Sequence, residues 1–320
     1  MLTHKEPRHV EELAARIQEL SPASEIAVHH DVRSRDVPWD GHPGSHCHLV
    51  ERGPVDWGDW SMVEATLRLL RFGVEVLRAD WLVLLSGEHR PVVDLEQWER
   101  DTARSGVDAL AQAIELPPRL KFGRAQGDLQ TYLARSRHRW RLAARPRADG
   151  LHRVVGGLAK VSQSLQPFGA LEYVHRRQAW AIGLRRPAGP TRDHRFFRGT
   201  QWIALNTRAV ESILHLDPTL SHWFRQSWIP DEAFFHTALR RQPHLMVSNA
   251  PTTFVLETPE RPTPGWMRLT MADLPAVWAA PVPFARKVDP VDRPEVVRAL
   301  DQAVDAQRAA RQARSPQPQS

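Results

Sequence analysis

The chain has 320 residues, of which 42% are apolar, and it contains one cysteine, Cys47. A chain of this length can bury one large core or two small ones, and a single cysteine excludes an intramolecular disulfide framework and indicates a reducing compartment. The 43 basic residues, nearly all arginine, exceed the 37 acidic ones and give a net charge of +6, which favours phosphates and other anions as partners.

Helices and strands alternate in the secondary structure predicted for the first hundred residues. Apolar side chains at helical spacing predict a helix over residues 10–20, and a short strand is predicted over residues 25–29. A longer amphipathic helix is predicted over residues 61–77, with Ser61 and Glu64 forming a capping box at its start. This alternation is typical of an α/β fold.

An unbroken apolar run over residues 81–85 predicts a buried parallel strand that ends in a loop at Ser86 and Gly87. In open α/β sheets, ligands bind beyond the carboxyl ends of such strands. Asp31, which follows the strand at 25–29, and the loop at 86–90 are therefore candidates for ligand contacts. The alternative for Asp31 is a solvated strand end before a turn.

The most basic part of the chain is the stretch 135–141, in which arginines alternate with other residues including Trp140, followed by Arg145 and Arg147. Arginines interleaved with aromatic residues can follow a phosphate backbone, so a basic nucleic-acid-binding protein is the rival interpretation. The stretch contains no recognisable nucleic-acid module, and acidic residues are interspersed among the basic ones elsewhere.

Residues 226–239 place an acidic pair before an apolar helix. Pro230 suits a first helical turn, and Asp231 and Glu232 face the positive end of the helix dipole, which favours an ionised carboxylate in a fixed position. The alternative is that the acidic pair only starts a helix. The apolar residues that anchor this helix recur at helical spacing: Phe234, Phe235, Ala238 and Leu239.

The C-terminal part is predicted to form a helix over residues 292–311 and a disordered tail over residues 315–320. The chain contains no run of about 18 apolar residues, and its N-terminus lacks an apolar signal core. We therefore expect a cytoplasmic protein, with peripheral contact to a membrane surface as an open alternative.

Six segments of the chain resemble, in the same order, those of one enzyme family, the core-2/I-branching β-1,6-N-acetylglucosaminyltransferases and peptide O-xylosyltransferases. The segments are residues 3–7 leading to 28–31, residues 57–66, 84–91, 199–202, 226–239 and 284–287. The resemblance implies one α/β domain of glycosyltransferase-A type (Rossmann-like), with a mixed, mainly parallel central sheet flanked by helices.

The implied domain covers residues 1–290, with a nucleotide-binding part over 1–100 and an acceptor and catalytic part over 100–290, and residues 291–320 form a C-terminal helix and tail. The family's first strand normally precedes the turn at Thr3, but here only Met1 and Leu2 do so. We therefore expect that the reading frame starts further upstream or that the sheet lacks a central element.

The resemblance implies a donor site for a uridine diphosphate sugar. Asp31 matches an aspartate that contacts uridine, and the loop at 86–90 replaces the metal-binding Asp-x-Asp of many related transferases. The full set of implied donor-binding residues is Asp31, Trp57, Ser86, Gly87, Arg268, Arg286 and Lys287. Because the chain contains no Asp-x-Asp, we expect fixed cations in place of a metal to stabilise the leaving diphosphate, and no cofactor. Arg261 is the alternative to Arg268 as second cation.

The resemblance also implies an inverting transfer in which Glu232 is the catalytic base and takes a proton from an acceptor hydroxyl. N-acetylglucosamine or xylose would be the sugar, and the acceptor a glycan, a peptide or a small molecule. The implied acceptor-binding residues are Glu96, Trp202 and Asp231. For Trp202 a buried structural role is the alternative to stacking on a sugar, and a sugar-binding relative without catalytic activity is a further alternative for the whole protein.

Overall fold

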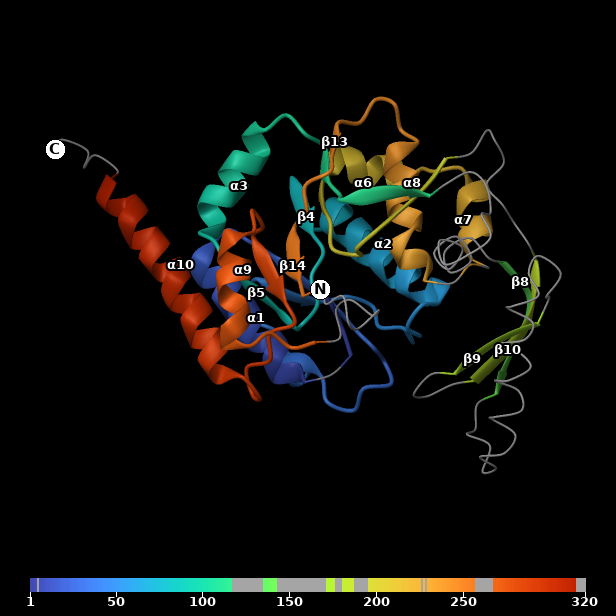
Figure 1. Ribbon diagram of the computed structural model, residues 1–320, viewed down its shortest axis with the longest axis horizontal. Helices are drawn as coiled ribbons and strands as arrows, with labels where there is room; N and C mark the ends of the chain where they lie inside the picture. Colours follow the sequence, from blue (N-terminus) through green and yellow to red (C-terminus); the bar gives the residue numbers. More distant parts are fainter. Residues whose placement is uncertain are drawn as a thin grey trace.

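The computed structural model describes residues 1–4, 6–116, 195–225, 227, 229–256 and 267–314, together with the backbone of three strands between residues 135 and 186 (Figure 1). The longer helices are α1 (Pro7–Leu20), α2 (Trp60–Glu75), α3 (Leu95–Arg104), α6 (Thr207–Leu214) and α10 (Pro294–Arg314). The shorter ones are α7 (Pro218–Phe224), α8 (Phe234–Arg240) and α9 (Leu274–Ala279), with 3-10 turns η1 (Pro38–Gly41), η2 (Pro230–Glu232) and η3 (Met271–Asp273).

The strands are short and form five small sheets. In chain order they are β1 (Leu2–Thr3), β2 (Ile26–His30), β3 (Cys47–Leu49), β4 (Trp81–Val83), β5 (His89–Pro91), β6 (Ala109–Leu110), β7 (Ala113–Leu116), β8 (Arg135–Leu142), β9 (Leu171–His175), β10 (Trp180–Arg186), β11 (Phe196–Gly199), β12 (Ala204–Asn206), β13 (Val247–Ser248), β14 (Thr253–Val255) and β15 (Phe284–Arg286). The sheet orders are β1-β2-β3, β13-β6-β12-β4, β14-β15-β5, β11-β7 and β8-β10-β9.

The predicted α/β class is confirmed, but the single, mainly parallel sheet is not. β1 pairs in parallel with β2, and β2 with β3, whereas β12 is antiparallel to both of its neighbours, β4 and β6. A parallel bridge between Leu2 and Ser86 joins the first of these sheets to the chain that continues from β4. β1 thus fills the position beside β2 with two residues, Leu2 and Thr3.

The predicted direction of the strand at 81–85 was wrong. β4 ends at Val83 and pairs antiparallel with β12, and its neighbour Leu84 donates its N–H to the carbonyl of Ile203 at 2.9 Å. The parallel contact appears only beyond β4, where Leu2 donates to the carbonyl of Leu85 at 2.9 Å. An apolar run indicates burial on both faces, but it carries no information on the direction of the partner strand.

The predicted helices are confirmed, with shifted ends. α1 starts at Pro7 because proline fits the first helical turn, and its buried face is apolar, with Val10, Leu13 and Ile17 at helical spacing. The capping box at Ser61 was wrong: α2 starts at Trp60, and the carboxylate of Asp59 accepts the N–H of Ser61 at 3.2 Å. An aspartate is as good a cap as a serine, so the helix starts earlier.

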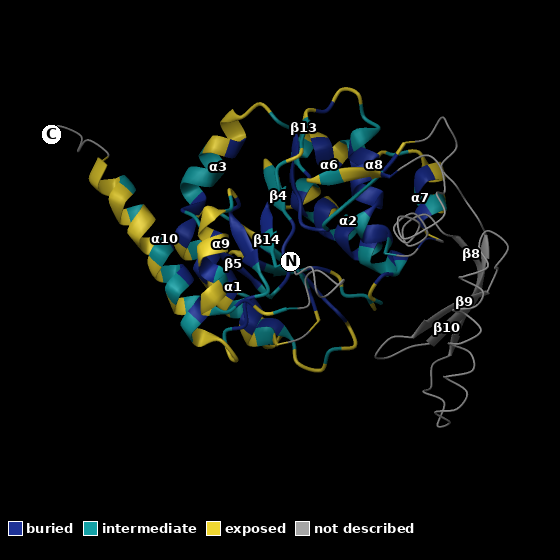
Figure 2. Ribbon diagram, viewed as in Figure 1, coloured by how far each residue is buried: buried dark blue, intermediate teal, exposed yellow. Residues whose placement is uncertain are grey.

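The helices lie in two groups. In Figure 1, α2, α6 and α8 pack together, while α1, α9 and α10 gather at the other end, with β4 and β14 between the groups. Figure 2 shows that burial is concentrated along the strands and the inner helix faces and that α10 exposes much of its surface. Each group of helices packs on clusters of buried apolar side chains, and the segments that carry the site pack on the same clusters.

α10 confirms the predicted C-terminal helix and is held to the body by ion pairs. Asp301 pairs with Arg90 and Arg16, and Arg311 pairs with Asp94 at 2.5 Å. The tail predicted over residues 315–320 lies outside the described residues, as does most of the middle of the chain. Of the basic stretch, residues 135–141 belong to β8, which pairs antiparallel with β10, while Arg145 and Arg147 are not described.

Candidate active site

Glu232 ends a 3-10 turn that lies directly before α8. The prediction had this acidic pair in the first turn of an α-helix, but η2 covers Pro230–Glu232 and α8 starts at Phe234. Asp231 is buried, and Glu232 is half-buried. The predicted apolar anchor is confirmed, because Phe234, Phe235, Ala238 and Leu239 are all at most 1% exposed. The turn therefore sits on a well-packed core.

Glu232 lies in the electrostatic field of Arg286. Burial lowers the pKa of the Arg286 guanidinium, while the carboxylates of Glu88 and Glu232 oppose this shift. Glu232 and Arg286 are both candidate site residues from the sequence analysis, and they come from η2 and β15.

Arg286 is held by three chemically different partners. Its Nε donates to the hydroxyl of Ser86 at 3.1 Å, and its guanidinium carbon lies 4.7 Å from the centroid of the Trp202 ring. Its Nη2 also pairs with the carboxylate of Glu88 at 3.4 Å. With a side chain 17% exposed, Arg286 is a half-buried cation whose partners fix its orientation.

Lys287 adds a second cation beside Arg286. Its Nζ lies 3.2 Å from the same Glu88 oxygen, Oε2, that Arg286 approaches. The sequence analysis placed Arg286 and Lys287 in one motif and gave no role to Glu88. We define the Arg286 cluster as Ser86, Glu88, Trp202, Glu232, Arg286 and Lys287.

His89 contacts this cluster through Ser86, and the sequence analysis gave it no role of its own. The backbone N–H of Ser86 donates to His89 Nδ1 at 3.0 Å, and the Ser86 hydroxyl lies 2.9 Å from the same nitrogen. Burial, and then the charge of Arg286, lower the pKa of His89 well below its usual value, so the ring is neutral. His89 thus contacts Ser86 at the backbone and at the hydroxyl, and the Ser86 hydroxyl oxygen accepts from Arg286 Nε.

Trp202 is 8% exposed and packs among these residues. The His89 ring meets it edge to face at 4.5 Å between centroids, and Arg286 lies over its ring. These contacts favour the buried structural role for Trp202 over stacking on a sugar.

Gly199 allows the segment that carries Trp202 to approach α8. A Cβ at this position would lie 2.1 Å from the carbonyl oxygen of Gln112 and 2.6 Å from Nε2 of His236. His236 Nε2 in turn lies 2.8 Å from the carbonyl of Thr200 and donates to it. Burial lowers the pKa of His236 to about 4, so this ring is neutral at pH 7. Together these contacts join residues 199–202 to the helix that follows Glu232.

Asp31 lies directly after β2 and holds a second cluster. Its carboxylate accepts from the side chain of Arg33 at 2.7 Å and from the backbone N–H of Val55 at 3.2 Å. Burial raises the pKa of Asp31, but the hydrogen bonds from Arg33 and Val55 outweigh it and lower the pKa overall. Arg33 also pairs with Asp56 at 2.8 Å. We define the Arg33 cluster as Asp31, Arg33, Val55 and Asp56.

The loop after the Arg33 cluster reaches the residue before η2. Trp57 is 51% exposed, and the carbonyl of the next residue, Gly58, accepts the N–H of Ile229 at 3.1 Å. Trp60 packs edge to face on Phe234 at 5.2 Å between centroids, and its side chain is buried. The implied nucleotide loop and the implied base therefore lie in neighbouring segments.

Two of the residues that the resemblance implied for the site, Glu96 and Arg268, form ion pairs away from the Arg286 cluster. Glu96, on α3, pairs with Arg311 of α10 at 2.9 Å and with Arg100 at 3.8 Å. Arg268 pairs with Asp289 at 2.7 Å. Neither set of contacts includes a member of the Arg286 cluster, and Arg261 is outside the described residues.

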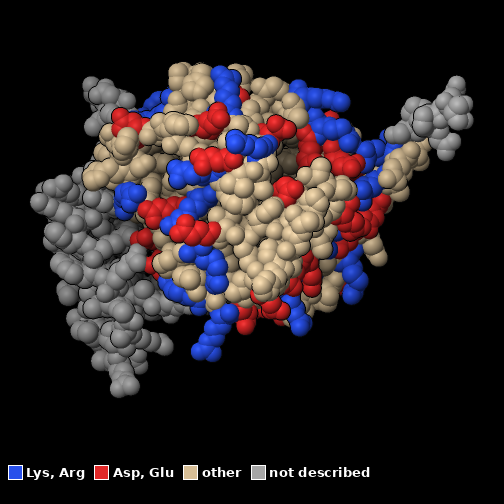
Figure 3. Space-filling view, turned by 180° about the vertical axis from the view of Figure 1, so that it is seen from behind, with Lys and Arg blue, Asp and Glu red and all other residues tan. Residues whose placement is uncertain are grey.

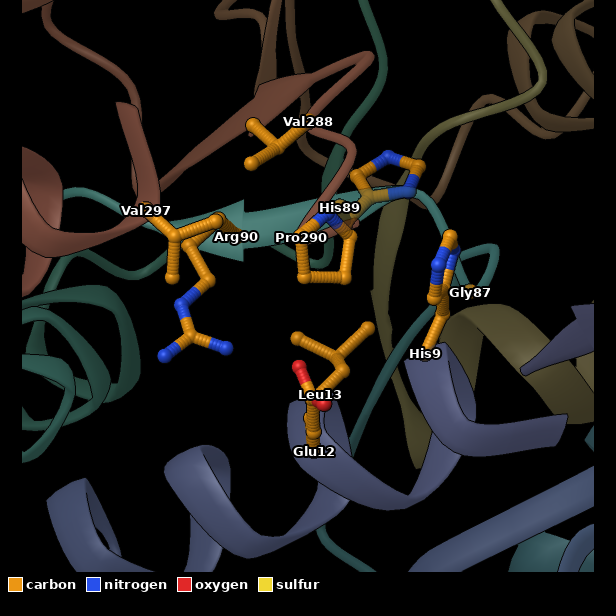
Figure 4. Close-up of a pocket in the computed structure, with 9 residues that line it drawn as sticks. All are labelled: His9, Glu12, Leu13, Gly87, His89, Arg90, Val288, Pro290 and Val297. Atoms are coloured by element: carbon orange, nitrogen blue, oxygen red, sulfur yellow. The ribbon is translucent and has the colours of Figure 1, made fainter. Parts of the chain in front are cut away.

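Gly87 lines a small cavity on the α1 side of its loop (Figure 4), with room for about one water molecule. In Figure 4 the side chains of His9 and Leu13 project into it from α1, opposite Arg90 and Pro290. This space is too small for a sugar.

Within the described ranges, no three or more His, Cys, Asp or Glu side chains are grouped so that they could hold a metal ion. Metal independence remains a prediction. No helix in the described part of the chain is both long and apolar enough to cross a bilayer. On the face shown in Figure 3, acidic and basic side chains are interspersed.

Comparison with known proteins supports the resemblance seen in the sequence. Residues 164–272, about a third of the chain, match the model of the Core-2/I-Branching enzyme family, a family of glycosyltransferases. The matched segment contains Trp202, Asp231 and Glu232, whereas Asp31, Ser86 and Lys287 lie outside it. No curated protein matches the chain.

Proposed function

Since a glycosyltransferase family model matches residues 164–272, we propose that this protein transfers a sugar from a UDP-sugar to an acceptor hydroxyl, with inversion and without a metal. The observation that supports this best is the Arg286 cluster. A half-buried carboxylate, Glu232, lies in the field of a half-buried arginine, Arg286, that is followed by a lysine. A displacement reaction needs a base for the attacking hydroxyl and cations for the leaving group.

In the proposed reaction, Glu232 takes the proton from the acceptor hydroxyl as that oxygen attacks the anomeric carbon. The bond from that carbon to the diphosphate oxygen breaks on the opposite side, and the configuration inverts. The turn that carries Glu232 is anchored by Phe234 and Phe235, so the base is held in position before the acceptor arrives.

Arg286 and Lys287 receive the negative charge that develops on the leaving diphosphate. Ser86 and Trp202 orient the guanidinium in advance, and its low exposure strengthens its interaction with an anion. Because the cations are already in place, little reorganisation is needed when the bond breaks.

The nucleoside would lie beside the Arg33 cluster, with Trp57 as an exposed aromatic surface and Asp31 at the strand end. N-acetylglucosamine or xylose is the proposed sugar, and Asp231 is the proposed acceptor contact nearest to the base. Glu96 is a weaker acceptor candidate because its recorded partners are Arg311 and Arg100.

A thermal-shift screen of nucleotide sugars, with and without EDTA, tests this proposal. We expect UDP and UDP-sugars to raise the melting temperature in a manner that EDTA does not change, since binding to the folded state alone stabilises it. Salt-dependent binding of RNA or DNA, with no response to any nucleotide, would instead favour the basic nucleic-acid-binding alternative.

A further inference from the structure

Glu88 places a negative charge on the two cations that the proposed function assigns to the donor. One oxygen, Oε2, lies 3.4 Å from Arg286 Nη2 and 3.2 Å from Lys287 Nζ. A phosphate oxygen that contacts both cations needs this same position. The protein's own carboxylate and the diphosphate are therefore rivals for one place.

Glu88 can leave this position more easily than either cation can. Its side chain is 36% exposed, against 17% for Arg286 and 23% for Lys287, so the carboxylate can turn into water. Its backbone need not move, because its carbonyl accepts the N–H of Val288 at 2.9 Å. The loop stays in register with the strand while the side chain changes rotamer.

We propose that Glu88 is a built-in competitor for the donor diphosphate, which occupies the anion position in the empty protein and swings out when the donor binds. The inference rests on the proposed function, because it takes Arg286 and Lys287 as the diphosphate-binding cations. Without donor, Glu88 offsets the cost of holding two adjacent positive charges that are partly removed from water.

The competition discriminates between ligands by their phosphate charge. A single carboxylate reaches both cations through one oxygen, whereas a diphosphate offers several charged oxygens and can contact each cation separately. A diphosphate can therefore displace Glu88 more effectively than a monophosphate, and a nucleoside without phosphate has no effect on it. Glu88 thus favours diphosphate donors over other uridine compounds.

Titration calorimetry with UDP, UMP and uridine on the whole chain tests the inference. Glu88→Gln keeps the size of the side chain and removes its charge, so UDP should bind about 3- to 30-fold tighter than to the wild type. The gain should be smaller for UMP and absent for uridine. Glu75→Gln, which removes the charge of an exposed glutamate paired with Arg71 on α2, is the matched control and should leave all three affinities unchanged.

The outcomes separate the inference from the proposed function. If the wild type binds UDP and Glu88→Gln binds it equally or more weakly, Glu88 orients the cations instead of competing, and the inference is overturned. An equal gain for uridine would also overturn it, because that gain could not come from the phosphates. If neither protein binds any of the three ligands, the proposed function fails, and the inference fails with it.

Discussion

Arg286 and Arg33 each hold carboxylates in the candidate site, but their surroundings differ. The Arg286 side chain is 17% exposed and its partners come from the loop after β4, from the segment between β11 and β12 and from η2. Arg33 is 47% exposed, and its partners Asp31 and Asp56 belong to the adjoining loops. Charge interactions are stronger where water is excluded. An ion pair of the same kind therefore interacts more strongly at Arg286 than at Arg33.

The difference separates a fixed part of the site from an adaptable one. The Arg286 cluster depends on several segments being folded at once, which suits the chemical step, since that step needs groups already in position. The Arg33 cluster is built from two loops and is open to water, which suits a region that changes its hydrogen bonds when a nucleotide enters. Substitutions in the Arg286 cluster should therefore have larger effects than substitutions in the Arg33 cluster.

Apart from the loss of the base Glu232 itself, the largest effect on activity is expected at Lys287. Lys287→Ala should lower kcat/KM by about 10- to 100-fold and weaken UDP binding as well, because the lysine faces a diphosphate that is charged in the ground state and more so as the bond breaks. Steady-state kinetics with EDTA present would measure this. Arg71→Ala, on the exposed face of α2, is the control and should be near normal.

If Lys287→Ala has no effect, the cation that stabilises the leaving diphosphate would be Arg286 or Arg268 instead. A strict requirement for manganese or magnesium would contradict the use of cations in place of a metal.

The buried region should also respond to pH through His236. Burial lowers its pKa in the folded protein to about 4 from an ordinary value of 6.5, so between these values the unfolded chain binds a proton that the folded chain does not. The stabilisation from neutral His236 is complete above about pH 6.5 and is lost as the pH falls toward 4. Lowering the pH from 7 to 5 should cost about 2 kcal/mol of unfolding free energy from this residue.

Urea unfolding at both pH values would measure this cost. His236→Gln keeps a donor for the Thr200 carbonyl but does not titrate. Its loss of stability between pH 7 and pH 5 should therefore be smaller than that of the wild type by about this amount. Equal losses in the two proteins would show that His236 is not the titrating group.

The smallest effect is expected at Arg33. Arg33→Gln removes an exposed ion pair with Asp56 and an ion pair with the buried carboxylate of Asp31, which keeps the backbone N–H groups of residue 33 and of Val55 as donors, so the unfolding free energy should fall by only about 1 kcal/mol. The same urea experiment at pH 7 measures it. A loss of several kcal/mol would remove the contrast between the two clusters, because Arg33 would then be as structurally important as a buried ion pair.

The parts of the fold that depend on local pattern could be predicted from the sequence. The helices α1 and α2 and the apolar anchor Phe234 and Phe235 follow from helical spacing, which is a property of neighbouring residues. The antiparallel direction of β4 could not be predicted in this way, because it depends on β12, which is more than a hundred residues away.

The candidate site also contains residues that short sequence motifs identified and residues that only the structure revealed. The short motifs around Glu232 and Lys287 identified candidates, and the fold brings Ser86, Glu232 and Arg286 together. The roles of Glu88 and His89 were not visible, because each depends on facing Arg286 or Ser86 in three dimensions. The one available signal was that His89 lies three residues after Ser86 in a tight loop.

Glu232→Gln tests the central claim most directly. The substitution keeps the shape of the side chain but removes its basicity. Turnover of the best UDP-sugar and acceptor should therefore fall by a factor on the order of 10²–10⁴, while UDP binding measured by calorimetry is kept. Glu211→Gln, at an exposed position on α6, should turn over normally. Near-normal turnover of Glu232→Gln would contradict the assignment of Glu232 as the base.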